Sequence, residues 1–438
     1  MVEPREARAW LDTHMNLEQR AGVPAGSRRR LLPEPLSRMQ SLIELLGSPQ
    51  LQYPAIHITG TNGKTSTARM TTALLMAAGL SVGTDTSPYL ERFNERIAWN
   101  GEPIPDDDLD RILVRIADIE PLLADRPSYF EIVNSAALEW FADVAVDVAV
   151  IEVGLGGTWD STNVIDGAVA VVTNVEIDHV EYLGPTRRDI AVEKAGIVKP
   201  GSTLVLGETD PDLVPIFSGR GARRVFTRNV DFGVRASSLA IGGRLVDLYT
   251  PYASYPDLFL PLHGAYQADN AVAALAAAES FLDRPLGRDV VEGALASVRS
   301  PGRLEVVGRN PLVIIDGTKN LAGARAIRSA LAEEFPCTRR TWVIGVLRQK
   351  DAHEMLEALG VGGDDRVVCC RPEISRARDP HEVASAARAL GVAPEQIDVV
   401  ESVVDAVRHA VATSGPDDQV IVAGSLYVAG PARTALVP

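Results

Sequence analysis

The chain has 438 residues, of which 46% are hydrophobic and 23% are charged. This length exceeds one ordinary domain, and the composition is typical of globular proteins with a sizeable core. The formal net charge of −15 argues against a nucleic-acid-binding surface but is compatible with a local basic pocket. We therefore expect two or three domains and no nucleic-acid partner.

The cysteines and the amino-terminal segment indicate the cellular compartment. Cys337, Cys369 and Cys370 show neither the spacing of a disulfide framework nor that of a zinc site, which favours a reducing cytoplasm. Residues 1–20 are charged and lack the apolar core of a signal peptide, and no apolar run is long enough to span a membrane. We therefore expect a cytoplasmic protein without a membrane partner.

Residues 53–75 combine a short apolar run, a glycine-bearing loop and a helix-favouring stretch from Thr67 onward. The loop consists of Gly60, Thr61, Asn62, Gly63, Lys64, Thr65 and Ser66. Its glycines let backbone N–H groups approach phosphate oxygens, and the following helix adds positive potential. Lys64 is expected to reach the terminal phosphates of a nucleotide, and Thr65 to place its hydroxyl on Mg²⁺. Ile58 stands at the first glycine position of the usual phosphate loop, so an ordinary strand–turn–helix junction is the alternative interpretation.

Other apolar runs alternate with helical segments, which indicates an open, mostly parallel α/β sheet. We expect strands at residues 81–84, 146–153 and 169–174, and helices at residues 36–46, 130–140 and 189–197, with a further alanine-rich helix that residues 262–270 open and that runs through residue 281. Short β-rich runs within residues 200–260 are expected to form a smaller sheet layer. The basic cluster at residues 28–30 is interpreted as a solvated loop.

A proline- and glycine-containing segment at residues 299–303 is a plausible domain hinge. Strand–helix units restart beyond it and predict a second doubly wound domain. The expected fold class is therefore α/β: a P-loop nucleotide-binding domain with a mostly parallel sheet at residues 1–298, and a smaller, Rossmann-like domain at residues 299–438.

Three polar residues near predicted strand ends could assemble a metal site. Ser87 lies in the loop after the second strand, Glu152 ends the next one, and His179 follows the strand after that. Carboxylate and hydroxyl oxygens suit Mg²⁺, while a histidine would admit Mn²⁺. Each residue alone is explained by ordinary capping or packing within the fold. Lys194, in the last turn of a predicted helix, is by spacing alone an ordinary surface lysine.

Seven motifs together resemble one family. They are GTNGKTS at 60–66, SPYL at 87–90, IEVGLGG at 151–157, TNVEIDH at 173–179, EKAGI at 193–197, SPGRLE at 300–305 and IDGTKNLAGA at 315–324. In this order they resemble the folylpolyglutamate synthase/dihydrofolate synthase family of the Mur ligase superfamily. Any one of these motifs is weak evidence, but their joint order along nearly the whole chain is specific.

The resemblance implies an ATP-dependent amide ligase with its reaction in the cleft between two domains. It assigns Lys64 and Thr65 to phosphate and Mg²⁺, and Ser87, Glu152 and His179 to a second Mg²⁺, with K⁺ or Mn²⁺ as further candidate cations. Lys194 matches a lysine that becomes a carbamate. The resemblance further assigns nucleotide contacts at the domain junction to Asn270, Arg303 and Asp316.

The implied reaction transfers the γ-phosphoryl group of ATP to a carboxylate, and the amine of an amino acid then attacks the acyl phosphate. The catalytic residues would be Lys64, Lys194, His179 and Arg303. Charge neutralisation and exclusion of water by domain closure would support both steps. The default substrates are L-glutamate and a folate or pterin-type carboxylate, and the expected oligomeric state is a monomer.

Four residues depart from the family pattern, while the phosphate loop, Glu152, His179 and Lys194 are intact. Tyr89 and Lys319 stand at positions where the family usually has histidine, Thr158 where it has arginine, and Leu321 where it has proline. Two alternatives therefore stay open. One is a paralogous ligase of the same mechanism with another acceptor or amino acid, and the other is an inactive nucleotide-binding regulatory protein.

Overall fold

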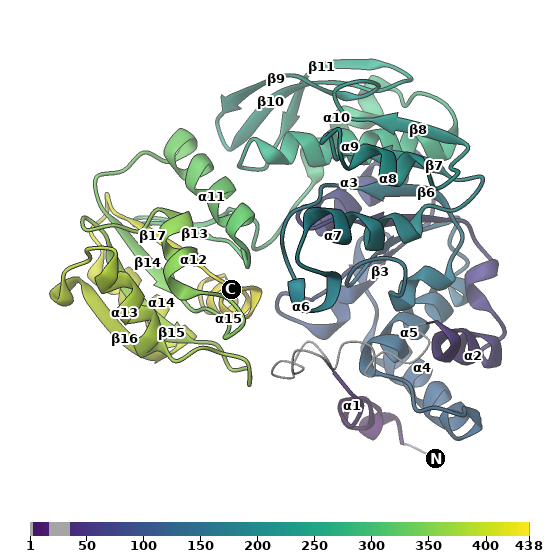
Figure 1. Ribbon diagram of the computed structural model, residues 1–438, viewed down its shortest axis with the longest axis horizontal. Coiled ribbons are helices and arrows are strands. Elements are labelled where there is room, and N and C mark those ends of the chain that lie inside the picture. Colours follow the sequence, from purple (N-terminus) through teal and green to yellow (C-terminus); the bar gives the residue numbers. More distant parts are fainter. Residues whose placement is uncertain (1–2, 17–35, 438) are drawn as a thin grey trace.

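The computed structural model describes residues 3–16 and 36–437 of the chain. Figure 1 shows two α/β units side by side, with the carboxyl-terminal unit, in green and yellow, on the left. The basic cluster at residues 28–30 lies outside the described residues. All three cysteines are free thiols, and no helix in the described part of the chain is long and apolar enough to cross a membrane.

The larger unit is organised around a sheet to which the described residues contribute eight strands, in the order β4-β3-β2-β5-β1-β6-β7-β8. The strands are β1 (Ala55–Thr59), β2 (Val82–Asp85), β3 (Ile97–Trp99), β4 (Glu102–Pro103), β5 (Val148–Glu152), β6 (Gly167–Val172), β7 (Thr203–Leu206) and β8 (Arg224–Thr227). From β2 to β8 the pairing is parallel, and β3 and β4 add an antiparallel edge. The expected mostly parallel sheet is thus confirmed.

Side chains of the parallel strands alternate between two apolar layers, as expected for strands that are buried on both faces. Val148 and Val150 of β5 pack with α3, α9 and α10, whereas Ala149 and Ile151 pack with α2, α4 and α5. The helices of this unit are α1 (Ala7–Asp12), α2 (Ser37–Leu45), α3 (Lys64–Ala77), α4 (Asp106–Ile119), α5 (Tyr129–Asp143), α6 (Val180–Leu183), α7 (Arg187–Lys194), α8 (Val214–Ser218), α9 (Tyr266–Leu282) and α10 (Arg288–Ser297).

The smaller sheet layer expected within residues 200–260 is only partly right. β7 and β8 instead extend the large sheet, because β7 pairs with β6. The separate sheet consists of β9 (Gly233–Ala240), β10 (Gly243–Tyr249) and β11 (Ser254–Leu260), paired antiparallel. Its inner side chains join the same apolar cluster as α3 and α9. Periodicity alone does not reveal which sheet a short strand joins, since that depends on partners distant in sequence.

The carboxyl-terminal unit is a second doubly wound domain, as expected. Its sheet has the order β12-β13-β17-β14-β15-β16, and β12 pairs antiparallel while the others pair in parallel. Its elements are β12 (Glu305–Arg309), β13 (Leu312–Ile315), α11 (Leu321–Glu334), β14 (Arg340–Ile344), α12 (Ala352–Leu359), β15 (Arg366–Arg371), α13 (Pro380–Ala389), β16 (Ile397–Ser402), α14 (Val403–Thr413), β17 (Gln419–Ala423) and α15 (Leu426–Leu436). The sequence did not predict β12 and β16, whose side chains are mostly half-buried or exposed.

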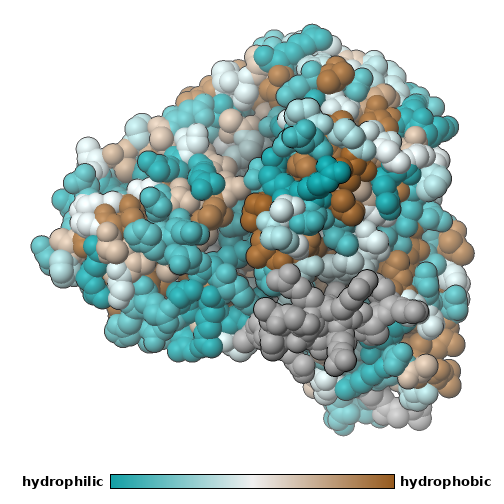
Figure 2. All heavy atoms as spheres, viewed as in Figure 1, coloured by the Kyte–Doolittle hydropathy of each residue, from teal (hydrophilic) through white to brown (hydrophobic). Residues whose placement is uncertain are grey.

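Polar contacts hold the two units together on both sides of the junction. Arg244 of β10 donates hydrogen bonds to Glu333 at 2.9 Å and to Glu334 at 2.6 Å in α11. On the other side, Arg433 of α15 pairs with Glu91 of the larger unit. The face in Figure 2 is mostly hydrophilic, with hydrophobic residues in separate small groups. Leu90 of the larger unit also packs against an apolar cluster of the carboxyl-terminal unit, so polar and apolar contacts together join the two units.

Candidate active site

The phosphate loop connects the carboxyl end of β1 to α3, and its backbone requires both glycines. Gly60 and Gly63 have φ values of +151° and +83°, which side chains disfavour. A Cβ atom on Gly60 would lie 1.8 Å from Thr173 Oγ1, and one on Gly63 would lie 2.2 Å from Asn270 Oδ1. The loop is therefore closely covered by Thr173, directly after β6, and by α9, which leaves no room for a side chain at either glycine.

Helix α3 begins at Lys64, three residues before the predicted start at Thr67. Lys64, Thr65 and Ser66 thus form its first turn, where backbone N–H groups have no partner within the helix. The polar Thr and Ser side chains have modest helix propensity, so the sequence pattern placed this turn in the loop. The correction strengthens the expectation of anion binding, because free N–H groups and the helix dipole coincide at one point.

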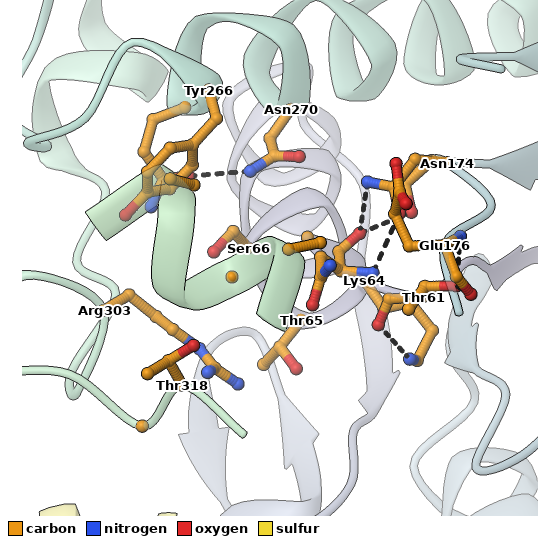
Figure 3. A pocket seen from close by; sticks show the side chains of 18 of the residues that line it. Thr61, Lys64, Thr65, Ser66, Asn174, Glu176, Tyr266, Asn270, Arg303 and Thr318 are labelled. Atoms are coloured by element: carbon orange, nitrogen blue, oxygen red, sulfur yellow. Dashed lines mark hydrogen bonds between the residues drawn. The ribbon is translucent and has the colours of Figure 1, made fainter. Parts of the chain in front are cut away.

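A cavity of about 300 Å³ lies in front of this turn, between the two units. Figure 3 shows Lys64, Thr65 and Ser66 on one side of it, with Arg303 reaching toward them from the carboxyl-terminal unit. The sequence-predicted nucleotide residues that line it are Thr61, Asn62, Gly63, Lys64, Thr65, Ser66, Asn270, Arg303 and Asp316. Gly60 instead lines a smaller, adjoining cavity. Residues from both domains therefore meet around one cavity, as the resemblance implied.

Asn174, at the end of β6, also lines this cavity but was not predicted as a site residue. Its Oδ1 accepts the Asn62 N–H at 3.0 Å, and its Nδ2 donates to the Asn62 carbonyl at 3.1 Å. Thr173 donates to the same carbonyl at 2.6 Å. These two residues hold the loop in shape, and their position at a polar strand end was the signal that could have identified them.

Thr65, Ser87 and Glu152, three of the four predicted metal ligands, lie together at one end of the cavity. Thr65 Oγ1 donates to the two Glu152 carboxylate oxygens at 3.0 and 3.1 Å, and the Ser87 N–H donates to Glu152 Oε2 at 3.3 Å. Burial raises the pKa of Glu152, although Lys64 and the Thr65 hydroxyl oppose that shift. The described residues contain no cluster of three or more His, Cys, Asp or Glu side chains that could hold a metal.

This set fits Mg²⁺, which is commonly held by one or two carboxylates, hydroxyl oxygens and the phosphates of a substrate. A desolvated carboxylate between two hydroxyl-bearing residues offers a cation the oxygen ligands it prefers. It does not offer the nitrogen- or sulfur-rich surroundings that zinc prefers.

His179, the fourth predicted ligand, lies on the other side of Lys64. It lines a cavity of about 20 Å³ together with Lys64 and Lys194, and it also borders a third cavity with Ser87. Its backbone has a φ value of +50°, which is strained for a residue with a side chain. Burial lowers its pKa to about 3, so its imidazole is neutral at pH 7 and can act as a ligand.

Lys194 is buried in the small cavity, so the surface-lysine interpretation is wrong. Its side chain is 3% exposed, and its Nζ donates to the Gly60 carbonyl at 2.9 Å. The Nζ of Lys64 donates to the same carbonyl, also at 2.9 Å. Burial, reinforced by the charge of Lys64, lowers the pKa of Lys194 well below its ordinary value. Burial likewise lowers the pKa of Lys64, to about 8.

Asp178 joins this site to the carboxyl-terminal unit and was not predicted as a site residue. Its carboxylate accepts hydrogen bonds from Lys350 at 2.6 Å and from Asn320 at 3.0 Å. Asn320 also donates to Asn62 of the phosphate loop at 3.0 Å. The position of Asp178 directly before His179 was the signal in the sequence, but its partners became visible only in the folded chain.

The four residues that depart from the family pattern have different surroundings. Tyr89 packs against Phe93 at a ring distance of 6.1 Å. Thr158 donates to the Glu193 carbonyl at 3.1 Å, and Leu321 is the first residue of α11. Lys319 is the one of the four that borders the cavities, and it lines all three of them.

The third cavity, of about 240 Å³, is walled by apolar and aromatic side chains from both units. These are Phe130, Leu155, Trp159, Tyr182, Leu347 and Tyr427. Lys64, Ser87 and Lys319 line both this cavity and the nucleotide cavity, so the two adjoin at these side chains. The third cavity also contains Arg376, whose buried Nε has no hydrogen-bond partner among the described residues.

Comparisons with known proteins agree with this arrangement. Residues 122–278 match the Mur ligase middle domain, and residues 302–426 match the Mur ligase, glutamate ligase domain. The dihydrofolate synthase/folylpolyglutamate synthase of Mycobacterium tuberculosis is 39% identical, over 91% of this chain and 89% of that protein. The folylpolyglutamate synthase of Lacticaseibacillus casei is 34% identical, over 91% of this chain and 94% of that protein.

Solved structures give the same result. The Mycobacterium tuberculosis folylpolyglutamate synthase, crystallised with ADP and AMPPCP, superposes with a TM-score of 0.87 at 38% identity. The match covers 94% of this chain and 97% of that one. A cavity between two domains, a phosphate loop and this similarity over nearly the full length agree with one another. The chain belongs to the dihydrofolate synthase/folylpolyglutamate synthase family of Mur ligases and is an ATP-dependent ligase that uses Mg²⁺.

Proposed function

We propose that this protein joins L-glutamate to a folate or pterin-type carboxylate, with release of ADP and phosphate. The observation that carries the proposal is that two cavities meet at Lys64, Ser87 and Lys319. One cavity is polar and is bordered by glycine, and the other is walled by aromatic side chains. A carboxylate bound in the aromatic-walled cavity would lie next to the terminal phosphate of a nucleotide bound in the other. This is the geometry that phosphoryl transfer to a carboxylate requires.

The chemistry of the third cavity supports a flat acceptor with an attached carboxylate. Phe130, Trp159 and Tyr182 provide ring surfaces for a heteroaromatic group. Arg38, which also lines the cavity, is already paired with Glu131 at 2.7 Å, whereas the Arg376 Nε is unsatisfied. We assign Arg376 to a substrate carboxylate, because a guanidinium recognises carboxylates through two parallel hydrogen bonds.

Lys64 and Arg303 are proposed to neutralise the negative charge that spreads over the transferring phosphoryl oxygens. Both side chains border the nucleotide cavity from opposite domains, so closure of the domains brings the two positive charges together. Thr65, Ser87 and Glu152 would hold Mg²⁺, which supplies electrostatic stabilisation of the phosphate oxygens when bound. We further propose His179 as a metal ligand and Asn270 and Asp316 as nucleotide contacts. K⁺ and Mn²⁺ stay as candidate additional cations.

Lys194 is proposed to carry a carbamate. Its buried position and lowered pKa favour the neutral amine, which is the form that adds CO₂. The resulting anion would lie beside His179 and Lys64, which line the same small cavity. An anionic oxygen ligand at this point would complement the oxygen set formed by Ser87 and Glu152.

Three further proposals concern the whole chain. The boundary between the domains lies at residues 298–299, directly after α10, with the linker running to Arg303. The protein acts as a monomer without a nucleic-acid partner, in keeping with its acidic charge of −15. It works in the cytoplasm, since its three cysteines are unpaired.

A phosphate-release assay tests the proposed substrates. The purified protein is given ATP and Mg²⁺ with dihydropteroate or tetrahydrofolate, and each amino acid in turn. We expect phosphate release only when a pterin-type carboxylate and L-glutamate are both present. Turnover with an amino acid other than L-glutamate, or in the absence of both pterins, would refute the substrate assignment while leaving the ligase mechanism in place. Binding of ATP without phosphate release for any pair of substrates would favour the inactive nucleotide-binding regulatory alternative.

One observation favours a second candidate, a paralogous ligase for a different acceptor or amino acid. Lys319 borders all three cavities, where the family usually has a histidine. A lysine places an ammonium group at the point where the acceptor meets the phosphate, and this group cannot accept a hydrogen bond. If the pterins fail as acceptors, the Lys319→His variant should be tested with them, and a gain of pterin activity would identify Lys319 as the residue that selects the acceptor.

A further inference from the structure

A fourth cavity lies outside the active site. It has a volume of about 590 Å³ and shares no lining residue with the three cavities around Lys64. Its walls come from α3, from the strand edge β2–β4 and from α10. In Figure 1 these helices belong to the larger unit. The volume is that of a typical small-molecule site, which ranges over about 300–1,000 Å³.

The charges that line this cavity are unusual for so acidic a protein. Arg69 of α3 and Arg299 after α10 contribute two guanidinium groups, against one carboxylate from Glu95. The Glu95 carboxylate is already held by the backbone N–H groups of Leu90 at 3.0 Å, Glu91 at 3.2 Å and Arg92 at 2.8 Å. The cavity is therefore locally positive in a chain of net charge −15.

Arg69 is half-buried and makes no ion pair or hydrogen bond with any described residue. Burial lowers its pKa, although Glu95 nearby opposes that shift. Two other partly buried arginines, by contrast, are paired: Arg38 with Glu131 and Arg187 with Glu208. A half-buried guanidinium without a protein partner is available to pair with a bound anion.

The remaining surface of the cavity suits an apolar body. Ala73, Met76 and Ala77 line the cavity from α3 at positions i, i+3 and i+4, and Val298 lines it directly after the end of α10. The Thr72 and Thr84 hydroxyls are bonded to each other at 2.7 Å, so they do not demand a polar partner. Methionine adapts its shape to what lies against it, which suits a site that encloses a small molecule.

We propose that this cavity binds a small organic anion, with its carboxylate on Arg69 and Arg299 and its apolar body against Ala73 and Met76. The site is separate from the ligase chemistry, because its ligand would touch none of the residues assigned to nucleotide, metal or acceptor. The proposed site is nevertheless connected to the active site through neighbouring residues of the chain. Arg69 lies on the helix that begins with Lys64, and Arg299 precedes Ser300, whose hydroxyl bonds Ser66 at 3.1 Å.

The test uses 2-naphthoate as the anionic probe and 2-naphthalenemethanol as its neutral counterpart. Binding to the full chain, saturated with ADP and Mg²⁺, is measured by isothermal titration calorimetry. Arg69→Gln removes the charge. Gly293→Leu fills the cavity, because a Cβ on Gly293, which lines it in α10, would meet no atom within 4 Å. Gly362→Leu is the matched control, since Gly362 is equally unobstructed but lies in the carboxyl-terminal unit.

We expect Arg69→Gln to weaken naphthoate binding about tenfold or more, as for the loss of one charge-assisted hydrogen bond. Gly293→Leu should abolish this binding, Gly362→Leu should leave it unchanged, and the neutral probe should bind the unsubstituted protein at least about tenfold more weakly. Thermal unfolding of each variant checks that it is folded, and Arg299→Gln replaces Arg69→Gln if the latter is not. Equal binding by the unsubstituted protein and Gly293→Leu would place the probe elsewhere, for example in the acceptor cavity, and would overturn the proposal. So would the absence of naphthoate binding to the unsubstituted protein.

Discussion

Replacing Asp178 with asparagine removes the negative charge on which two residues of the carboxyl-terminal domain converge. Lys350 donates to this carboxylate at 2.6 Å and Asn320 at 3.0 Å, and the side chain of Asp178 is 4% exposed. Asparagine keeps the size and one acceptor oxygen. The variant therefore tests the charge of Asp178 with little change of shape.

The expected loss of stability lies between two known limits. Breaking a buried ion pair costs about 3–5 kcal/mol, whereas an exposed pair contributes about 0–1 kcal/mol. Lys350 retains 25% exposure and can regain water when its partner is lost. We therefore expect Asp178→Asn to destabilise the folded protein by about 2 kcal/mol, which lowers the melting temperature of a domain of this size by about 4 °C.

The pH dependence has a definite sign. Burial alone would raise the pKa of Asp178, but the charges of protonated His179, Lys319 and Lys350 outweigh it and hold the pKa well below the ordinary value. A carboxyl group whose pKa is lowered in the folded state stabilises that state above its unfolded pKa of about 3.9. This contribution is lost as the pH falls below that value. The difference in stability between the two proteins should therefore be full at pH 7 and shrink below about pH 4.

Differential scanning calorimetry measures the stability, and small-angle X-ray scattering measures the separation of the domains. Asp178→Asn should broaden the distance distribution because Lys350 and Asn320 no longer hold the cleft closed. Asp283→Asn is the control, since Asp283 pairs with Arg224 at the same 2.6 Å but is 65% exposed and lies away from the junction. An unchanged melting temperature and scattering curve for Asp178→Asn would refute the role of Asp178 as a link between the domains.

Other variants test the proposed site residues. Lys64→Ala should abolish ATP turnover with little loss of stability, because its charge meets phosphate rather than core; near-normal phosphate release would contradict the phosphate-loop assignment. Glu152→Gln should raise the Mg²⁺ requirement sharply, since one anionic ligand is lost; an identical Mg²⁺ titration would remove Glu152 from the metal site. Lys194→Ala should be nearly inactive, with partial rescue by added short-chain carboxylates, and the unsubstituted protein should lose activity in CO₂-depleted buffer. Full activity of Lys194→Ala would end the carbamate proposal.

Local sequence patterns were sufficient where adjacent residues determine the structure. The apolar run at residues 146–153 is buried on both faces as β5, and the alanine-rich segment forms α9. Glycine and lysine in the loop at residues 60–66 predicted an anion site, since a left-handed backbone and free N–H groups require those residue types. The order of seven motifs indicated the family, because their order and spacing together are specific even where each alone is weak.

Only the tertiary structure decided the properties that depend on contacts between distant segments. The spacing of Lys194 suggested a surface lysine, but its burial against the Gly60 carbonyl comes from packing α7 against the phosphate loop, 134 residues earlier. β7 and β8 joined the large sheet because of pairing with β6, not because of their own composition. Asp178 became a link between domains only when Asn320 and Lys350 met it from 142 and 172 residues away. The sequence thus determined the local helices and strands and the chemical groups that they carry. Burial, which changes pKa values, and the pairing of residues distant in sequence arose only in the folded chain.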